Sequence, residues 1–183
     1  MNLQDDALST LNAYQVHYFT PEAISGLRDH VLQKIKPEAC AGFTPQQISK
    51  LTNTDEQPTC RGLSEMCISH MSLFAFEGFT ASCVQRLVPT AFKSISSEML
   101  HKIPADAMRG FTPELLHNIQ DPACEGFTDA QLTMLTYPKV CAAFRASCLA
   151  KIHPSSYSGF TAQCISNLYP ESFKMLSAEQ LMY

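Results

Sequence analysis

The sequence predicts an all-α protein, an α-solenoid of about eleven 16-residue repeats that forms a single domain over residues 1–183. Two observations carry this prediction. An aromatic or aliphatic residue recurs at steps of 16 along nearly the whole chain, and all seven glycines immediately precede one of these residues. A fixed period with glycines at one fixed position is typical of a repeat array rather than of one globular core.

The recurring residues, called anchors below, are Leu11, Leu27, Phe43, Leu63, Phe79, Ile95, Phe111, Phe127, Phe144, Phe160 and Leu176. Eight of the ten steps between them are 16 residues long. One step carries four extra residues within 52–59, which we interpret as a polar loop insertion. Another step carries one extra residue within 135–143.

The unit that starts at Gly110 illustrates the structure expected of each repeat. Thr112 is a favoured N-cap, and the apolar residues four, five and eight positions after the anchor then share one helical face. Pro122 stops this helix and starts a second helix of one turn, which Gly126 ends in a left-handed conformation. Glutamines three residues after the N-cap complete capping boxes in three units: Gln47, Gln131 and Gln180.

Sixteen residues cannot bury a core alone, so we expect successive units to stack, one per coil, into a right- or left-handed superhelix. The columns five and eight residues after the anchors are expected to face the core. The pattern is cut inside a unit at both ends, near Leu8 and at Tyr183. We therefore expect a segment of a longer repeat protein, or ends protected by self-association.

The recurring phrase GFTxxQ(I/L)xxLxPxAF resembles the short tandem helical repeats of bacterial surface and secreted effector proteins. The resemblance covers nearly the whole chain as a style of repeat and carries over no functional residues. It implies that the chain could be a secreted effector that acts in a host cytosol.

Composition narrows the classes of function. The net charge of -4 at pH 7 makes nucleic acid an unlikely partner, and no run of 18 apolar residues predicts a membrane span. The start, MNLQDDALS, lacks the apolar region of a secretory signal. The sequence contains no Ser-His-Asp arrangement, HExxH motif or glycine-rich phosphate loop, so we expect no enzyme activity, cofactor or metal.

Eight cysteines fall in two columns that otherwise hold mostly apolar residues or Gln. Four stand three residues before an anchor (Cys40, Cys60, Cys124, Cys141) and four stand four residues after one (Cys67, Cys83, Cys148, Cys164). Stacked helices lie about 8–10 Å apart, whereas a disulfide needs Cα atoms within roughly 4.4–6.8 Å. We therefore expect free, buried thiols and a reducing, cytoplasmic compartment.

Seven residues after successive anchors, five units carry a basic or titratable side chain: Lys34, Lys50, His70, Arg86 and Lys102. With one unit per coil they would form a row along one edge. Such cations complement the dipole at a helix C-terminus, or they form a stripe for an acidic peptide, a phosphorylated segment or a nucleic-acid backbone. Three histidines stand six residues after an anchor: His17, His101 and His117. They belong to a solvated helix face, or else the two in adjacent units, His101 and His117, form a pair that binds a metal or responds to pH.

The array predicts a non-enzymatic scaffold that binds another protein or peptide through an extended surface. Nucleic-acid or phospho-ligand binding through the basic row is the alternative. A third possibility is a repeat segment of a larger enzyme or effector.

Overall fold

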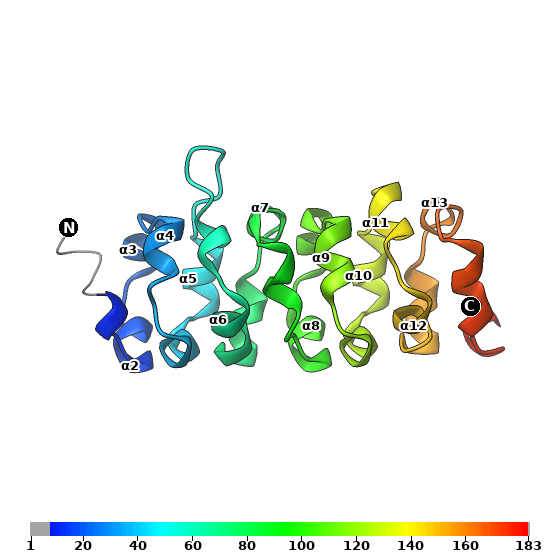
Figure 1. Ribbon diagram of the computed structural model, residues 1–183, viewed down its shortest axis with the longest axis horizontal. Helices are drawn as coiled ribbons and strands as arrows, with labels where there is room; N and C mark the ends of the chain where they lie inside the picture. The colour runs from blue at the N-terminus through cyan, green and yellow to red at the C-terminus, as the bar shows by residue number, and fades with distance from the viewer. Residues whose placement is uncertain (1–7, 183) are drawn as a thin grey trace.

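The computed structural model describes residues 8–182, which form an elongated rod of short helices (Figure 1). The predicted all-helical repeat architecture is confirmed. Within the described residues there is no β-strand, although an isolated β-bridge joins Asn53 and Pro58 in the four-residue insertion. No helix among residues 8–182 is long and apolar enough to cross a bilayer.

The α-helices are α2 (Ala13–His17), α3 (Pro21–Ser25), α4 (Asp29–Leu32), α5 (Pro45–Ser49), α6 (Glu65–His70), α7 (Ala81–Arg86), α8 (Ser97–Lys102), α9 (Pro113–Asn118), α10 (Asp129–Thr133), α11 (Pro138–Ala142), α12 (Ala146–Leu149) and α13 (Ala162–Ile165). The 3-10 helices are η1 (Leu8–Thr10), η2 (Pro37–Gly42), η3 (Thr59–Gly62), η4 (Leu73–Gly78), η5 (Pro89–Phe92), η6 (Ala105–Gly110), η7 (Asp121–Gly126), η8 (Pro154–Gly159), η9 (Pro170–Met175) and η10 (Gln180–Met182).

The predicted caps start these helices. The hydroxyl of Thr112 accepts a hydrogen bond from the amide of Leu115 at 3.1 Å. The same bond recurs at Thr44, Ser64, Thr80, Thr128 and Thr161. The capping boxes predicted for Gln47, Gln131 and Gln180 are present. Because helices this short are unstable alone, caps and packing between coils must hold them.

Successive helical segments lie on three walls of the rod in strict rotation. Wall A stacks α2, η2, α6, η5, α9, α11 and α13 in that order. Wall B stacks α3, α5, η4, α8, η7, α12 and η9, and wall C stacks α4, η3, α7, η6, α10, η8 and η10. One coil therefore contains three segments.

A coil of three segments corresponds to one and a half repeats, so the expectation of one repeat per coil was wrong. A repeat supplies two short helices and two bends, one at the anchor and one at the proline corner. Closing a three-sided coil takes three helices and three bends. Neighbouring repeats consequently present the same sequence position on different walls.

The anchors fill the interior of the rod. Six phenylalanines form a continuous ladder of rings with centroids 5.6–6.5 Å apart: Phe79, Phe92, Phe111, Phe127, Phe144 and Phe160. Phe92 supplies the ring where the anchor itself is Ile95. The column five after the anchors is buried from Val16 to Leu149, and the column eight after them is buried from Ile35 to Leu168, as predicted. Near the ends of the rod the prediction was wrong, because these columns continue with exposed residues: Phe19, Ile165 and Leu181.

The glycines allow close packing between coils. None of the described glycines has a positive φ, so the predicted left-handed reversal was wrong. A Cβ on Gly110 would instead lie 2.0 Å from the carbonyl oxygen of Ala81 in the preceding coil. The glycine leaves room for that carbonyl.

Four disulfides join neighbouring coils, so the expectation of free thiols was wrong. The pairs are Cys40–Cys67, Cys60–Cys83, Cys124–Cys148 and Cys141–Cys164, with Cα atoms 5.2–5.5 Å apart. The prediction compared a distance between helix axes with a distance between Cα atoms. A Cα atom lies about 2.3 Å from its helix axis, so the facing Cα atoms of stacked helices can approach to roughly 3.4–5.4 Å. The inferred reducing, cytoplasmic compartment therefore loses its basis.

Candidate functional site

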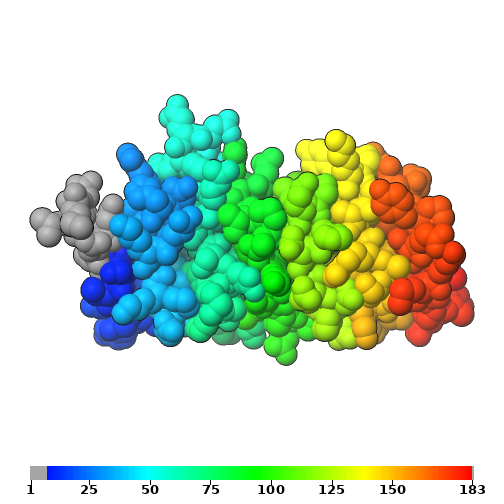
Figure 2. Space-filling view, viewed as in Figure 1, coloured from blue at the N-terminus to red at the C-terminus, as the bar shows by residue number. Residues whose placement is uncertain are grey.

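The single extra residue within 135–143 changes the local structure of the rod. Most other repeats have a 3-10 helix in their second half, whereas this repeat forms α11. The amide of Cys141 accordingly donates to the carbonyl oxygen of Tyr137, four residues earlier, at 3.2 Å. Tyr137 is the N-cap residue of α11, Pro138 is its first residue, and the Tyr137 side chain is 62% exposed. This segment stands out from the surface of the rod (yellow in Figure 2).

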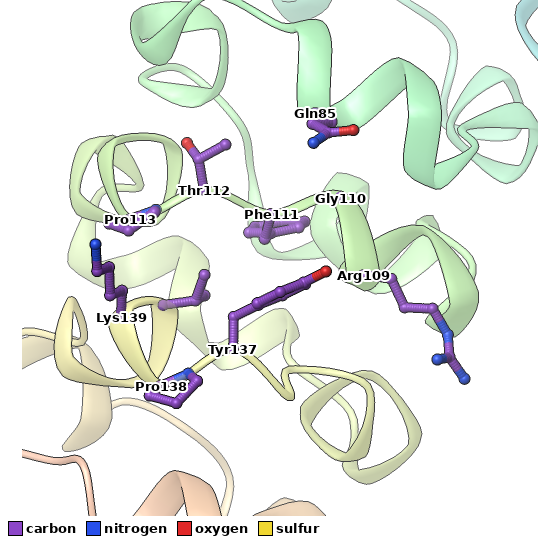
Figure 3. Close-up of a pocket in the computed structure, with 10 residues that line it drawn as sticks. Gln85, Arg109, Gly110, Phe111, Thr112, Pro113, Tyr137, Pro138 and Lys139 are labelled. Atoms are coloured by element: carbon purple, nitrogen blue, oxygen red, sulfur yellow. The ribbon is translucent and has the colours of Figure 1, made fainter.

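A hollow of about 500 Å³ lies beside the start of α11, where wall C meets wall A. Its lining residues are Gln85, Arg109, Gly110, Phe111, Thr112, Pro113, Tyr137, Pro138, Lys139 and Val140. Figure 3 shows the Tyr137 ring lying across this hollow toward Phe111 and Gly110. The Arg109 side chain extends away from the hollow, while Lys139 extends beside Pro113.

Two further hollows continue from the first across wall A toward wall B. Pro113 also lines a hollow of about 430 Å³, together with Pro89, Glu114, His117, Asn118 and Ala143. His117 and Ala143 in turn line a third hollow of about 580 Å³, which ends at the start of η9 and is also lined by Ala142, Phe144, Arg145, Ala146, Tyr169, Pro170, Glu171 and Ser172. These three hollows are called the Tyr137–Tyr169 groove below.

The groove is apolar with an uneven distribution of charge. No carboxylate lines the first hollow, and Lys139 makes no ion pair with a described residue. Glu114 lines the middle hollow and Glu171 lines the third. In the third hollow the Arg145 guanidinium lies 2.6 Å from a carboxylate oxygen of Asp121 and donates to the carbonyl oxygen of Ile119. The groove is therefore more basic at its Tyr137 end.

The structure does not bring the five residues of the predicted basic row together. On wall C, Lys34 follows α4 and Arg86 is the last residue of α7. On wall B, Lys50 follows α5 and Lys102 is the last residue of α8. On wall A, His70 is the last residue of α6. The separation follows from the coil length, because neighbouring repeats lie on different walls. The histidines of adjacent repeats, His101 and His117, are divided between walls B and A for the same reason.

Several members of this set also have local partners. Arg86 forms an ion pair with Asp55 in the inserted loop. The Lys102 ammonium lies 3.0 Å from a carboxylate oxygen of Glu77 and 5.6 Å from the centroid of the Phe74 ring. The Nδ1 atom of His70 lies 2.8 Å from the carbonyl oxygen of Met66. Within residues 8–182, no group of three His, Cys, Asp or Glu side chains is placed to hold a metal ion.

Sequence reasoning did not select the residues of the groove. The extra residue within 135–143 was visible, but its structural effect was not. A second signal was the dipeptide Tyr-Pro, which occurs twice, at 137–138 and 169–170, and marks both ends of the groove. Each tyrosine directly precedes the helix that its proline begins.

No protein-family model matches the chain, and no curated protein sequence is significantly similar to it.

Proposed function

We propose that the chain is a non-enzymatic scaffold that holds an extended segment of a partner protein in the Tyr137–Tyr169 groove. The observation that carries the proposal is the continuity of the three hollows, which share Pro113, His117 and Ala143. A concave, mostly apolar surface with a few polar groups is the usual form of a recognition site. Two largely exposed tyrosines supply the amphipathic aromatic area that interfaces favour.

Covalent bonds support the elements that line this groove. Cys124–Cys148 joins η7 to α12, and Cys141–Cys164 joins α11 to α13. A surface fixed before binding loses less conformational freedom when a ligand binds, and more of the contact energy then appears as affinity. The disulfides thus favour a preformed binding surface over a segment that orders on binding.

We also infer that the protein functions in an oxidising compartment. Cytosolic thiols are kept reduced, whereas structural disulfides persist in secreted, periplasmic or lumenal proteins. Four disulfides that each join successive coils are typical of that environment.

The test is a selection of random peptides displayed on phage against the immobilised, oxidised protein. The dissociation constants of recovered peptides are then measured by fluorescence polarisation. Tyr137→Ala should weaken binding by about tenfold or more, as expected for an aromatic interface anchor. The matched control is Tyr18→Ala, which should leave binding unchanged. Tyr18 is the C-cap residue of α2 and is similarly exposed, at 66%.

Circular dichroism and melting curves must show that both variants remain folded. Recovered peptides that bind the Tyr137→Ala variant as tightly as the parent would contradict the assigned site. A labelled single-stranded oligonucleotide tests the nucleic-acid alternative in the same assay. Tight binding that weakens steeply with added salt would favour that alternative over the present proposal.

A further inference from the structure

The groove presents the same dipeptide at both of its ends. Tyr137–Pro138 borders the first hollow and Tyr169–Pro170 borders the third, with tyrosine side chains that are 62% and 63% exposed. We propose that the groove selects a proline-containing segment in the polyproline II conformation, with its acidic residues at the Tyr137 end. This inference rests on the proposed function and adds the class of ligand.

The lining favours this mode of recognition over the addition of a ligand strand. Adding a ligand strand to a sheet requires an exposed sheet edge, and the described residues contain no sheet. Proline-rich segments instead dock into aromatic-lined grooves. A polyproline II segment has no internal hydrogen bonds and keeps its backbone solvated, so it does not need a row of main-chain partners.

Four of the lining residues of this groove are prolines, which have no amide hydrogen to donate: Pro89, Pro113, Pro138 and Pro170. The tyrosine rings and proline rings offer flat apolar faces instead. A ligand with its own prolines matches these faces, and because it is already extended it loses little conformational entropy on binding.

The length of the ligand follows from the path of the groove. The tyrosines at its two ends precede helices of successive coils, α11 and η9, and the groove crosses wall A between them. Its span is therefore about one coil step of 8–10 Å together with the width of one helix, about 10–12 Å. Polyproline II rises about 3.1 Å per residue, so a segment of about ten residues is long enough to reach from one tyrosine to the other.

Charge sets the direction of the ligand along the groove. Lys139 borders the first hollow without an acidic partner. Glu114 borders the middle hollow, and Glu171, which forms an ion pair with Lys174, borders the third. An acidic side chain therefore meets favourable charge at the Tyr137 end and repulsion beside Glu114. Reversing the charge of Lys139 should reverse this preference.

The test uses fluorescein-labelled decapeptides and fluorescence polarisation with the oxidised 183-residue chain. Two probes carry proline at every third position and differ in where their two glutamates lie. One has both glutamates at its N-terminal end, and the other has both at its C-terminal end. Matched probes replace every proline with alanine, or both glutamates with lysine. We expect one acidic proline probe to bind and its alanine counterpart to bind about tenfold more weakly. Tyr137→Ala and Tyr169→Ala should each weaken binding several-fold, whereas Tyr18→Ala should not.

The Lys139→Glu variant should bind the acidic probe more weakly and the lysine probe more tightly than the parent does. Equal binding of the proline and alanine probes would overturn the inference. The inference would also be overturned if neither acidic proline probe bound while peptides selected from the random library bound through Tyr137. In that case the proposed function would still stand. If no selected peptide depends on Tyr137, the proposed function fails as well.

Discussion

The side-chain amide of Gln131 donates a hydrogen bond to the carbonyl oxygen of Ile103 in the preceding coil, at 2.7 Å. The same amide donates to the carbonyl oxygen of Leu100 at 2.9 Å, and the side-chain oxygen of Gln131 accepts a hydrogen bond from the backbone amide of Thr128. One buried side chain thus caps the start of its own helix and the end of α8. Gln47 and Gln180 repeat this arrangement in other coils.

Replacing Gln131 with leucine should lower the free energy of unfolding by about 1–3 kcal/mol, because it leaves buried carbonyl oxygens without donors. The column itself accepts leucine, which occurs at Leu115. The control is Gln15→Leu, since Gln15 completes a capping box on an exposed helix and makes no bond to another coil. Chemical denaturation measures both variants. Equal losses would show that the bonds between coils contribute nothing.

Gly110 tests the close approach between coils. Its Cβ would lie 2.0 Å from the carbonyl oxygen of Ala81, a backbone atom that cannot turn aside. Gly110→Ala should therefore destabilise the chain by at least about 1–3 kcal/mol, the usual cost of overpacking. Gly26→Ala is the control, because a Cβ there meets its nearest atom at 3.7 Å. Comparable melting temperatures for the two variants would contradict the stacking described.

The sequence was sufficient to predict the caps and the core columns, since these depend on positions within one repeat. Thr112 and Leu116 lie where the 16-residue pattern places them. The three-walled coil was not predicted, because the period of the sequence differs from the period of the coil. The positions of Lys50 and Arg86 on different walls follow from that difference.

The disulfides left a regular signal that was overlooked. Two of the cysteines before an anchor have partners 23 residues later. The other two have partners 24 and 27 residues later, and these two intervals contain the one-residue and the four-residue insertion. The groove left a weaker signal. The exposure of Tyr137 depends on how α11 projects from wall A, and a single extra residue in the sequence does not specify that projection.

Tyr157 should make stability fall at alkaline pH. Burial raises the pKa of Tyr157 well above its usual value of about 10, and its hydroxyl donates to the carbonyl oxygen of Leu149 at 2.7 Å. The unfolded chain then loses this proton more readily than the folded chain does. The stabilisation is complete below about pH 10 and is lost as pH rises toward the folded-state pKa.

Denaturation at a series of pH values between about 8 and 11 measures this effect. The parent should lose more stability over that range than a Tyr157→Phe variant, which lacks the titrating hydroxyl. Parallel pH profiles for the two proteins would show that the hydroxyl ionises equally well in the folded state.

The most direct test of the three-walled coil is a map of the disulfides. The protein, purified without reductant and alkylated to block exchange, is digested and its linked peptides are identified by mass spectrometry. The coil predicts four pairs: Cys40–Cys67, Cys60–Cys83, Cys124–Cys148 and Cys141–Cys164. Eight alkylated thiols, or links between near neighbours such as Cys60–Cys67 and Cys141–Cys148, would contradict it.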